Sequence, residues 1–144
     1  MRRSWLIIIF GTLAVGGVAL AQHGEHGKGG VKTLSRKAIT EKIDGKKAMA
    51  TTVEVTLGPG ESGAPHRHPG PAFGYILEGE YEWAIDDQPA RVLKAGETFY
   101  EPAGCLHRVS RNPSKEGKTR IRAVVLHPAA VKDIVIPEKA KKQQ

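Results

Sequence analysis

The chain has 144 residues and a formal net charge of +7, from 22 lysines and arginines and 15 acidic residues. This length fits a single domain. The positive excess lies outside residues 50–130. The basic segments 22–49 and 131–144 contain no aromatic residues, which argues against a nucleic-acid-binding protein. The only cysteine, Cys105, cannot form an internal disulfide, so a packed core must stabilise the fold.

The N-terminus has the three parts of a secretory signal peptide. Arg2 and Arg3 precede an apolar stretch over residues 5–20, which ends in Ala19-Leu20-Ala21. We expect cleavage after residue 21, which makes 1–21 the signal peptide and the mature protein periplasmic or secreted. No stable membrane association is then expected. The alternative is an uncleaved anchor, but three glycines interrupt the short apolar stretch.

Residues 22–48 are basic, and their first part is polar and rich in glycine. Such a composition cannot bury enough apolar surface to become ordered on its own. We therefore predict a flexible basic segment over 22–48, in which only residues 34–43 fit a short helix.

Residues 49–130 have the pattern of many short β-strands. Apolar and polar residues alternate over 49–57, which is typical of a strand with one wet face. Further strand-like segments, separated by turn residues, lie at 73–77, 80–85, 91–93, 98–101, 107–111 and 120–127. This spacing predicts an all-β sandwich or barrel. Residues 131–144 are expected to add a final strand, over 131–136, and a basic tail.

Three histidines in this region suggest a metal site. On a strand, His66 and His68 point to the same face, because successive side chains alternate. His107 follows at the end of the turn-rich segment Pro102-Ala103-Gly104-Cys105-Leu106. Three imidazole nitrogens leave coordination positions open, as in catalytic sites. We predict that these histidines bind one divalent transition metal, and such ligands suit Fe, Mn, Ni, Cu and Zn alike.

The segments around the histidines resemble the two signature motifs of the cupin superfamily. The matching positions are Gly60, His66, His68 and Gly79 in the first motif, and Gly96, Pro102, Gly104 and His107 in the second. The resemblance implies a cupin-type jelly-roll β-barrel over residues 49–130. It also implies a metal bound by the three histidines, a small-molecule substrate or ligand, and a homodimer that pairs through strand edges.

The sequence departs from the family pattern at Ala72, which stands where the family's usual metal-binding glutamate is expected. Three neutral imidazoles leave a divalent ion with its full charge, so a bound water becomes more acidic and anions bind more strongly. The alternative is a degenerate barrel that keeps only a binding cavity. If position 72 faces the ion, an Ala72→Glu substitution is expected to raise metal retention.

Two further residues are candidates for catalysis. Glu101 precedes Pro102 in the second motif, and it is interpreted as a substitute for the missing carboxylate or as a proton acceptor. The alternative is a surface glutamate at a strand end. Tyr75 is a candidate acid in the cavity, and its alternative role is packing in the barrel wall.

The resemblance implies an exported, metal-binding cupin, and three functions follow from it. The first is a metal-dependent enzyme that carries out dioxygenase-type oxidation of a small organic substrate. The second is a Lewis-acid lyase or isomerase, similar to hydroxynitrile lyases. The third is a non-enzymatic cupin that binds a small ligand or a metal. Because this barrel supports many reactions, the fold alone does not select among them.

Overall fold

The computed structural model describes residues 29–139 and contains ten strands in that range. The predicted signal peptide and the end of the basic tail lie outside the described residues. The strands are β1 (Gly30–Ile43), β2 (Lys46–Leu57), β3 (His66–Arg67), β4 (Ala72–Glu78), β5 (Glu80–Ile85), β6 (Arg91–Lys94), β7 (Thr98–Glu101), β8 (Leu106–Arg111), β9 (Thr119–Pro128) and β10 (Ile136–Pro137).

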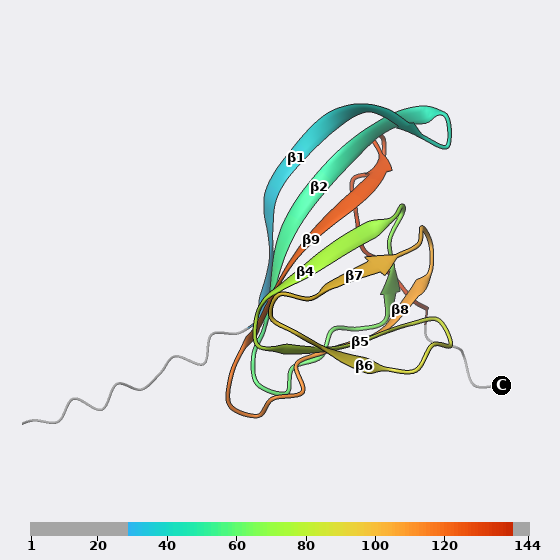
Figure 1. The fold of residues 1–144 in the computed structure, drawn as a ribbon. Coiled ribbons are helices and arrows are strands. Elements are labelled where there is room, and N and C mark those ends of the chain that lie inside the picture. Colours follow the sequence, from blue (N-terminus) through green and yellow to red (C-terminus); the bar gives the residue numbers. More distant parts are fainter. Residues whose placement is uncertain (1–28, 140–144) are drawn as a thin grey trace, which may run out of the picture.

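The strands form two antiparallel sheets of five strands each (Figure 1). The first sheet has the order β1-β2-β9-β4-β7, and the second has the order β10-β3-β8-β5-β6. β1 and β2 are the longest strands, and their connecting turn projects beyond the other strands at the top of Figure 1. The all-β fold predicted from the strand pattern is confirmed. Within residues 29–139, no helix is long and apolar enough to span a membrane.

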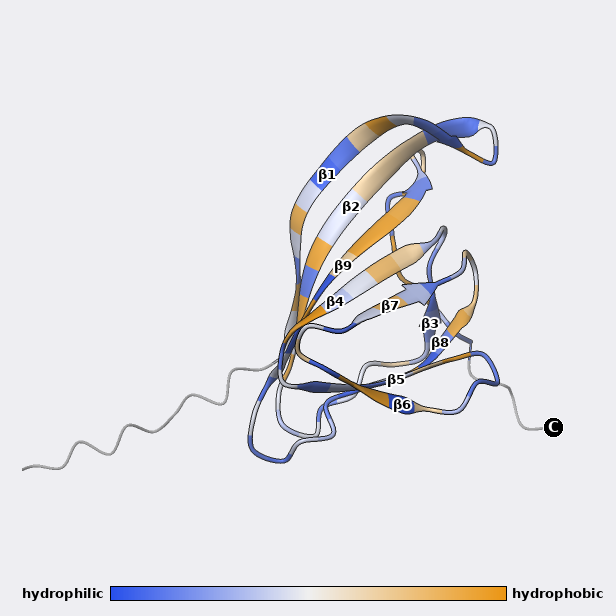
Figure 2. Cartoon of the chain, viewed as in Figure 1, coloured by the Kyte–Doolittle hydropathy of each residue, from blue (hydrophilic) through white to orange (hydrophobic). Residues whose placement is uncertain are grey.

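The core fills the space between the two sheets, and apolar and polar residues alternate along several strands (Figure 2). In β4, for example, Ile76 is buried whereas Phe73 and Tyr75 face solvent. Gly74 lies on the inward face, where a Cβ atom would come within 2.0 Å of the Phe99 ring. The buried apolar cluster consists of Leu57, Ile76, Tyr81, Trp83, Ile85, Leu93, Phe99 and Ile121.

The expectation of a flexible segment over 22–48, with a short helix at 34–43, is wrong for residues 30–48. Residues 30–43 form β1, which pairs with β2 from Gly30 opposite Thr56 to Ile43 opposite Lys46. Asp44 and Gly45 make the connecting turn with φ angles of 49° and 71°. Positive φ at both positions defines the two-residue hairpin turn that Asp-Gly favours. β1 is an edge strand with mostly exposed side chains, so its polar sequence lacks the apolar alternation that would predict a strand.

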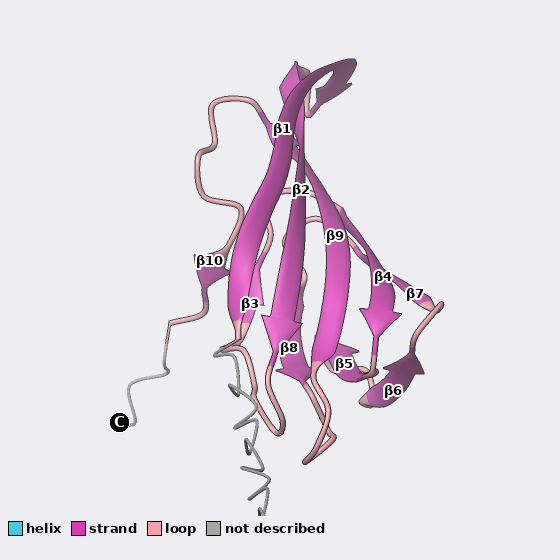
Figure 3. Ribbon diagram, turned by 90° about the vertical axis from the view of Figure 1, so that its left-hand side faces the viewer, coloured by secondary structure: helices cyan, strands magenta, loops and turns pink. Residues whose placement is uncertain are grey.

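The C-terminal segment crosses to the sheet that carries the histidines (Figure 3). The final strand predicted over 131–136 is shorter and later than expected, because only β10, Ile136–Pro137, pairs with β3. Residues 131–135 form a loop before it. This loop and β10 pass beside β3, where Pro137 pairs with His66 and the carbonyl of Ile134 contacts His68 Nδ1.

Candidate metal site

Strands β3 and β8 bring the three predicted metal ligands together. His66 in β3 is the direct register partner of His107 in β8, and His68 follows β3 immediately. The His66 ring lies 4.9 Å from the ring of His68 and 4.9 Å from that of His107, between centroids. One potential ligand atom of each histidine lies within 4.8 Å of the other two. The predicted convergence of these side chains is therefore present in the structure.

Local geometry fixes this arrangement. Gly104, in the turn before β8, has φ of 73°, a conformation that glycine adopts without steric cost. Its N–H donates to the carbonyl of His68 at 3.1 Å, which ties the turn to the end of β3. Arg67 points away from the histidines, as strand alternation predicts, and contacts Glu138 at 2.9 Å. The Gly104 turn thus ties the segment that carries His107 to the end of the segment that carries His66 and His68.

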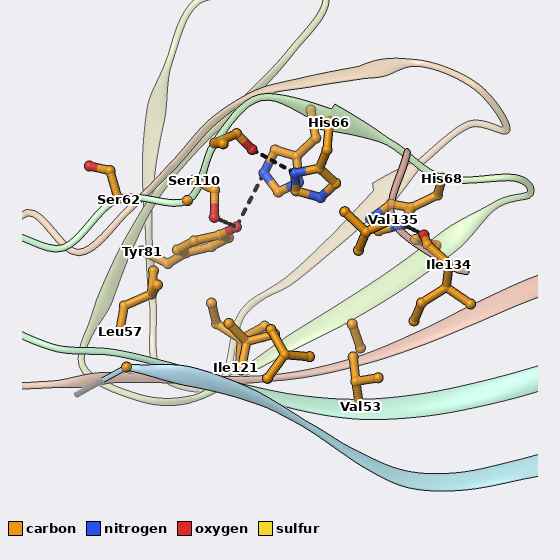
Figure 4. A pocket seen from close by; sticks show the side chains of 18 of the residues that line it. Val53, Leu57, Ser62, His66, His68, Tyr81, Ser110, Ile121, Ile134 and Val135 are labelled. Atoms are coloured by element: carbon orange, nitrogen blue, oxygen red, sulfur yellow. Dashed lines mark hydrogen bonds between the residues drawn. The ribbon is translucent and has the colours of Figure 1, made fainter. Parts of the chain in front are cut away.

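Backbone carbonyls set the tautomers of two histidines. His66 Nδ1 lies 2.9 Å from the carbonyl of Ala64, and His68 Nδ1 lies 2.5 Å from that of Ile134 (Figure 4). A carbonyl only accepts, so both Nδ1 atoms carry the proton. The Nε2 atoms of His66 and His68 therefore present lone pairs. Such second contacts commonly orient metal-binding histidines.

Tyr81 sets the tautomer of the third histidine. Its hydroxyl donates to Ser110 Oγ at 2.8 Å and lies 3.2 Å from His107 Nε2. Because the single hydroxyl hydrogen is used on Ser110, His107 Nε2–H must donate to Tyr81. His107 Nδ1 is then unprotonated, and it is buried without a hydrogen-bond partner. The third lone pair thus belongs to Nδ1.

Burial keeps all three imidazoles neutral. Loss of solvation lowers the pKa of His66 and of His68, and it lowers that of His107 from 6.5 to about 3. The neighbouring histidines lower the pKa of His107 further. Since a neutral imidazole is the form that binds a metal, protons compete weakly for this site at neutral pH.

Glu101 lies inside the site, so its interpretation as a surface residue is wrong. It is only 1% exposed, and its Oε1 accepts a hydrogen bond from Trp83 Nε1 at 3.0 Å. Oε1 also lies 3.1 Å from His107 Nδ1, and Oε2 lies 3.4 Å from His68 Nε2. Oε2 is buried and has no hydrogen-bond partner. Burial raises the pKa of this carboxyl above its ordinary value.

Tyr75 does not belong to the site, which corrects its prediction as a cavity acid. Its side chain is 46% exposed, because it lies on the outward face of β4. The tyrosine that lines the cavity is Tyr81 in β5, which is 2% exposed. The alternation of Tyr81, Trp83 and Ile85 indicated a common face in the sequence. It did not indicate that this face meets the histidines.

The histidines form one wall of a cavity of about 340 Å³ (Figure 4). The opposite wall is apolar and comes from β2 and β9, with side chains of Val53, Val55, Leu57, Ile121 and Val125. Ile134 and Val135 of the C-terminal loop line the cavity beside His68 (Figure 4). None of the lining residues in the described part of the chain is a lysine or an arginine. The cavity therefore suits a small, largely apolar molecule.

These residues fit a bound metal ion. Three neutral imidazoles with fixed tautomers are suitable ligands for a transition metal. Two buried polar atoms, His107 Nδ1 and Glu101 Oε2, have no hydrogen-bond partner in the protein. Buried polar atoms are rarely left in this state, and an ion is one of the ways in which they are satisfied.

Comparison with known proteins identifies the family. The cupin domain family model matches residues 53–126. A Klebsiella pneumoniae protein with a double-stranded β-helix domain superposes with a TM-score of 0.58 and 18% identity, covering 78% of this chain and 87% of that chain. A cupin 2 conserved barrel domain protein from Salinispora arenicola has a TM-score of 0.52 and 24% identity, with coverages of 69% and 76%.

The DMSP lyase DddQ from Ruegeria pomeroyi is also similar, with a TM-score of 0.55, 20% identity, and coverage of 73% of this chain and 50% of that chain. At these identities, the similarity concerns the fold. No curated protein matches the sequence significantly. The jelly-roll fold that the two motifs implied is confirmed, and the chain belongs to the cupin family.

Proposed function

We propose that this chain is an exported metal-dependent cupin enzyme, in which His66, His68 and His107 hold one divalent transition metal for the oxidation of a small organic substrate. The observation that carries the proposal is the set of three neutral imidazoles at the wall of a cavity, with one potential ligand atom of each within 4.8 Å of the other two. When bound, the metal supplies Lewis-acid and redox chemistry toward dioxygen and an electron-rich substrate.

The protein's own residues would perform three tasks. The carbonyls of Ala64 and Ile134 and the hydroxyl of Tyr81 keep each imidazole in the tautomer that presents a lone pair. The apolar wall from β2 and β9 excludes water and binds the body of the substrate. Because no lysine or arginine lines the described cavity, substrates such as enols, diketones and thiols fit better than multiply charged anions.

A second candidate function is a Lewis-acid lyase or isomerase, and Glu101 supports it. A buried carboxyl group with a raised pKa beside the cavity can accept a proton from a substrate carbon. In this alternative, the substrate loses a proton to Glu101 and no dioxygen is consumed. The lyase DddQ shares the fold, which makes the chemistry compatible with this barrel without assigning it.

The test is elemental analysis of the protein purified without a histidine tag, followed by oxygen uptake with enols, diketones and thiols. We expect about one ion of iron, manganese or copper per chain, and its loss in the His66→Ala/His68→Ala/His107→Ala variant. A triple variant that retains the wild-type amount of metal contradicts the proposal. Zinc without oxygen uptake supports the lyase. Metal-free protein that binds a small ligand supports a binding protein.

We also propose that two copies pair and that the protein acts outside the cytoplasm. Phe73 and Tyr100 support pairing, because both rings are half exposed on the outward face of β4 and the edge strand β7, with centroids 5.1 Å apart. Light scattering of the wild type and of a Phe73→Ser variant tests this, and a monomeric wild type contradicts it. Export rests on the N-terminal sequence, and cell fractionation with N-terminal sequencing of the mature protein tests it.

A further inference from the structure

Within residues 29–139, Glu101 is the only carboxylate that contacts the site histidines, through His68 at 3.4 Å and His107 at 3.1 Å. We propose that Glu101 is the fourth ligand of the metal site and that it supplies, from β7, the carboxylate that position 72 lacks. This inference rests on the proposed three-histidine site. It changes the predicted ligand set from three nitrogens to three nitrogens and one oxygen.

The strand register supports this substitution. Ala72 in β4 and Glu101 in β7 are direct partners in the antiparallel ladder, and both are 1% exposed on the inward face. The Cβ atoms of directly paired residues are typically about 4.5–5.5 Å apart. A carboxylate on residue 101 therefore reaches the same part of the cavity as a carboxylate on residue 72. The small Ala72 side chain leaves room for it.

Glu101 faces the nitrogen lone pairs of two histidines, and contacts of this kind require a cation or a proton between the two groups. His68 Nε2 presents a lone pair, because the proton is on Nδ1, and it faces Glu101 Oε2 at 3.4 Å. His107 Nδ1 also presents a lone pair and faces Glu101 Oε1 at 3.1 Å. Both contacts therefore place acceptor against acceptor. Glu101 can hold one proton, which relieves one contact and leaves the other, whereas a single cation relieves both.

The separations also agree with ligands that share an ion. Zinc-type bonds to nitrogen and oxygen are about 2.0–2.2 Å long. Two such ligands at octahedral or tetrahedral angles are then separated by about 2.8–3.6 Å. The contacts of Glu101 with His107 and His68, at 3.1 Å and 3.4 Å, fall in this range. The remaining bond of Oε1 is the one donated by Trp83, which fixes the carboxylate plane.

A fourth, anionic ligand alters the expected chemistry of the site. A carboxylate offsets one unit of the ion's charge, so the site carries about +1 instead of the +2 expected for three imidazoles alone. A bound water is then less acidic than in the three-histidine case. This ligand role also removes Glu101 from the role of free proton acceptor, which favours the oxidative function over the lyase.

The decisive experiment measures the affinity for Co²⁺ by competition with a chelator, and records the visible absorption of the Co²⁺ protein. In Glu101→Gln, which keeps the shape and an acceptor for Trp83, we expect the affinity to fall by more than about 100-fold. Loss of an outer-shell partner costs only about 10- to 100-fold. Trp83→Phe is the matched control, and its loss is expected to stay within that smaller range.

A swap variant provides the complementary test. Glu101→Ala is expected to lose affinity and to change the Co²⁺ spectrum, and adding Ala72→Glu to it is expected to restore both. A Glu101→Gln protein whose Co²⁺ affinity falls by less than about 100-fold overturns the proposal, because the loss of an outer-shell partner would account for it. A swap variant that binds no better than Glu101→Ala also overturns it. If the wild type itself binds no Co²⁺, the proposed three-histidine metal site is wrong. This outcome distinguishes a failure of the proposed function from a failure of the Glu101 proposal alone.

Discussion

Replacing Tyr81 by phenylalanine removes the hydroxyl that accepts from His107 Nε2–H and donates to Ser110 Oγ. His107 Nε2–H is then buried without a partner, which costs about 1–3 kcal/mol. The imidazole avoids this cost by moving its proton to Nδ1, where Glu101 Oε1 lies 3.1 Å away. Nδ1 is the nitrogen that the metal requires, so the proton and the metal now compete for it.

The magnitude of the effect follows from this competition. The metal-bound form of Tyr81→Phe must keep the proton on Nε2 and bear the cost of the unpaired donor. A cost of about 1–3 kcal/mol lowers the metal affinity by about 5- to 150-fold. Losing the bond to Ser110 also destabilises the metal-free protein by about 0.5–1.5 kcal/mol. Chelator competition with Co²⁺ measures the first quantity, and urea denaturation of the metal-free protein measures the second.

Ser110→Ala is the matched control. It removes the acceptor of the Tyr81 hydroxyl but leaves the hydroxyl beside His107 Nε2. Its metal-free stability is expected to fall by a similar amount, of about 0.5–1.5 kcal/mol, while its metal affinity stays near that of the wild type. The tautomer argument is refuted if Tyr81→Phe binds Co²⁺ as tightly as the wild type, or if Ser110→Ala loses as much affinity.

Three further predictions follow from the site. Because burial lowers the pKa of His107 from 6.5 to about 3, the unfolded chain gains a proton as the pH falls through this window while the folded chain does not. His107 alone therefore lowers the free energy of unfolding of the metal-free protein by up to about 1.4 kcal/mol for each unit that the pH falls, which urea denaturation in the presence of a chelator measures. The raised pKa of Glu101 opposes this trend, but His66 and His68 add to it, and a flat profile contradicts the assignment. Deleting residues 131–144 removes the Ile134 carbonyl from His68 Nδ1 and is expected to lower Co²⁺ affinity by about 10- to 100-fold, measured by equilibrium dialysis. A Tyr75→Phe variant is expected to match the wild type in metal content and oxygen uptake, because Tyr75 faces solvent. A loss of metal or of oxygen uptake in this variant would show that Tyr75 takes part in the site.

The histidines could be predicted because the rules that place them are local. His66 and His68 share a face through strand alternation, and Gly104 with its positive φ marks the turn that leads to His107. The motifs around them also carry the family resemblance. The direct pairing of His66 with His107 is a long-range property, which the sequence suggested only through that resemblance.

Glu101 and Tyr81 illustrate what the local rules leave open. Glu101 shares the inward face of β7 with Phe99, but Tyr100 on the outward face is also apolar, so alternation did not identify the buried side. The opposing sheet decides it, because Trp83 of β5 and His107 of β8 lie against Glu101 and cover that face of β7. The inward face of Tyr81 was visible in the sequence, whereas its contact with His107 depends on how β5 lies beside β8.

The sequence by itself determined an all-β chain in which His66 and His68 share one face, because strand alternation and turn conformation act over only a few residues. The meeting of His107 with this pair was implied by the family resemblance. Tertiary structure decided which carboxylate, hydroxyl and carbonyl complete the site: Glu101 from β7, Tyr81 from β5, and Ile134 from the C-terminal loop. The tertiary structure also adds the polar strand β1 to the sheet, because its hydrogen bonds to β2 depend on the backbone and not on apolar side chains. These contacts join residues far apart in the chain, so they exist only once the strands have paired.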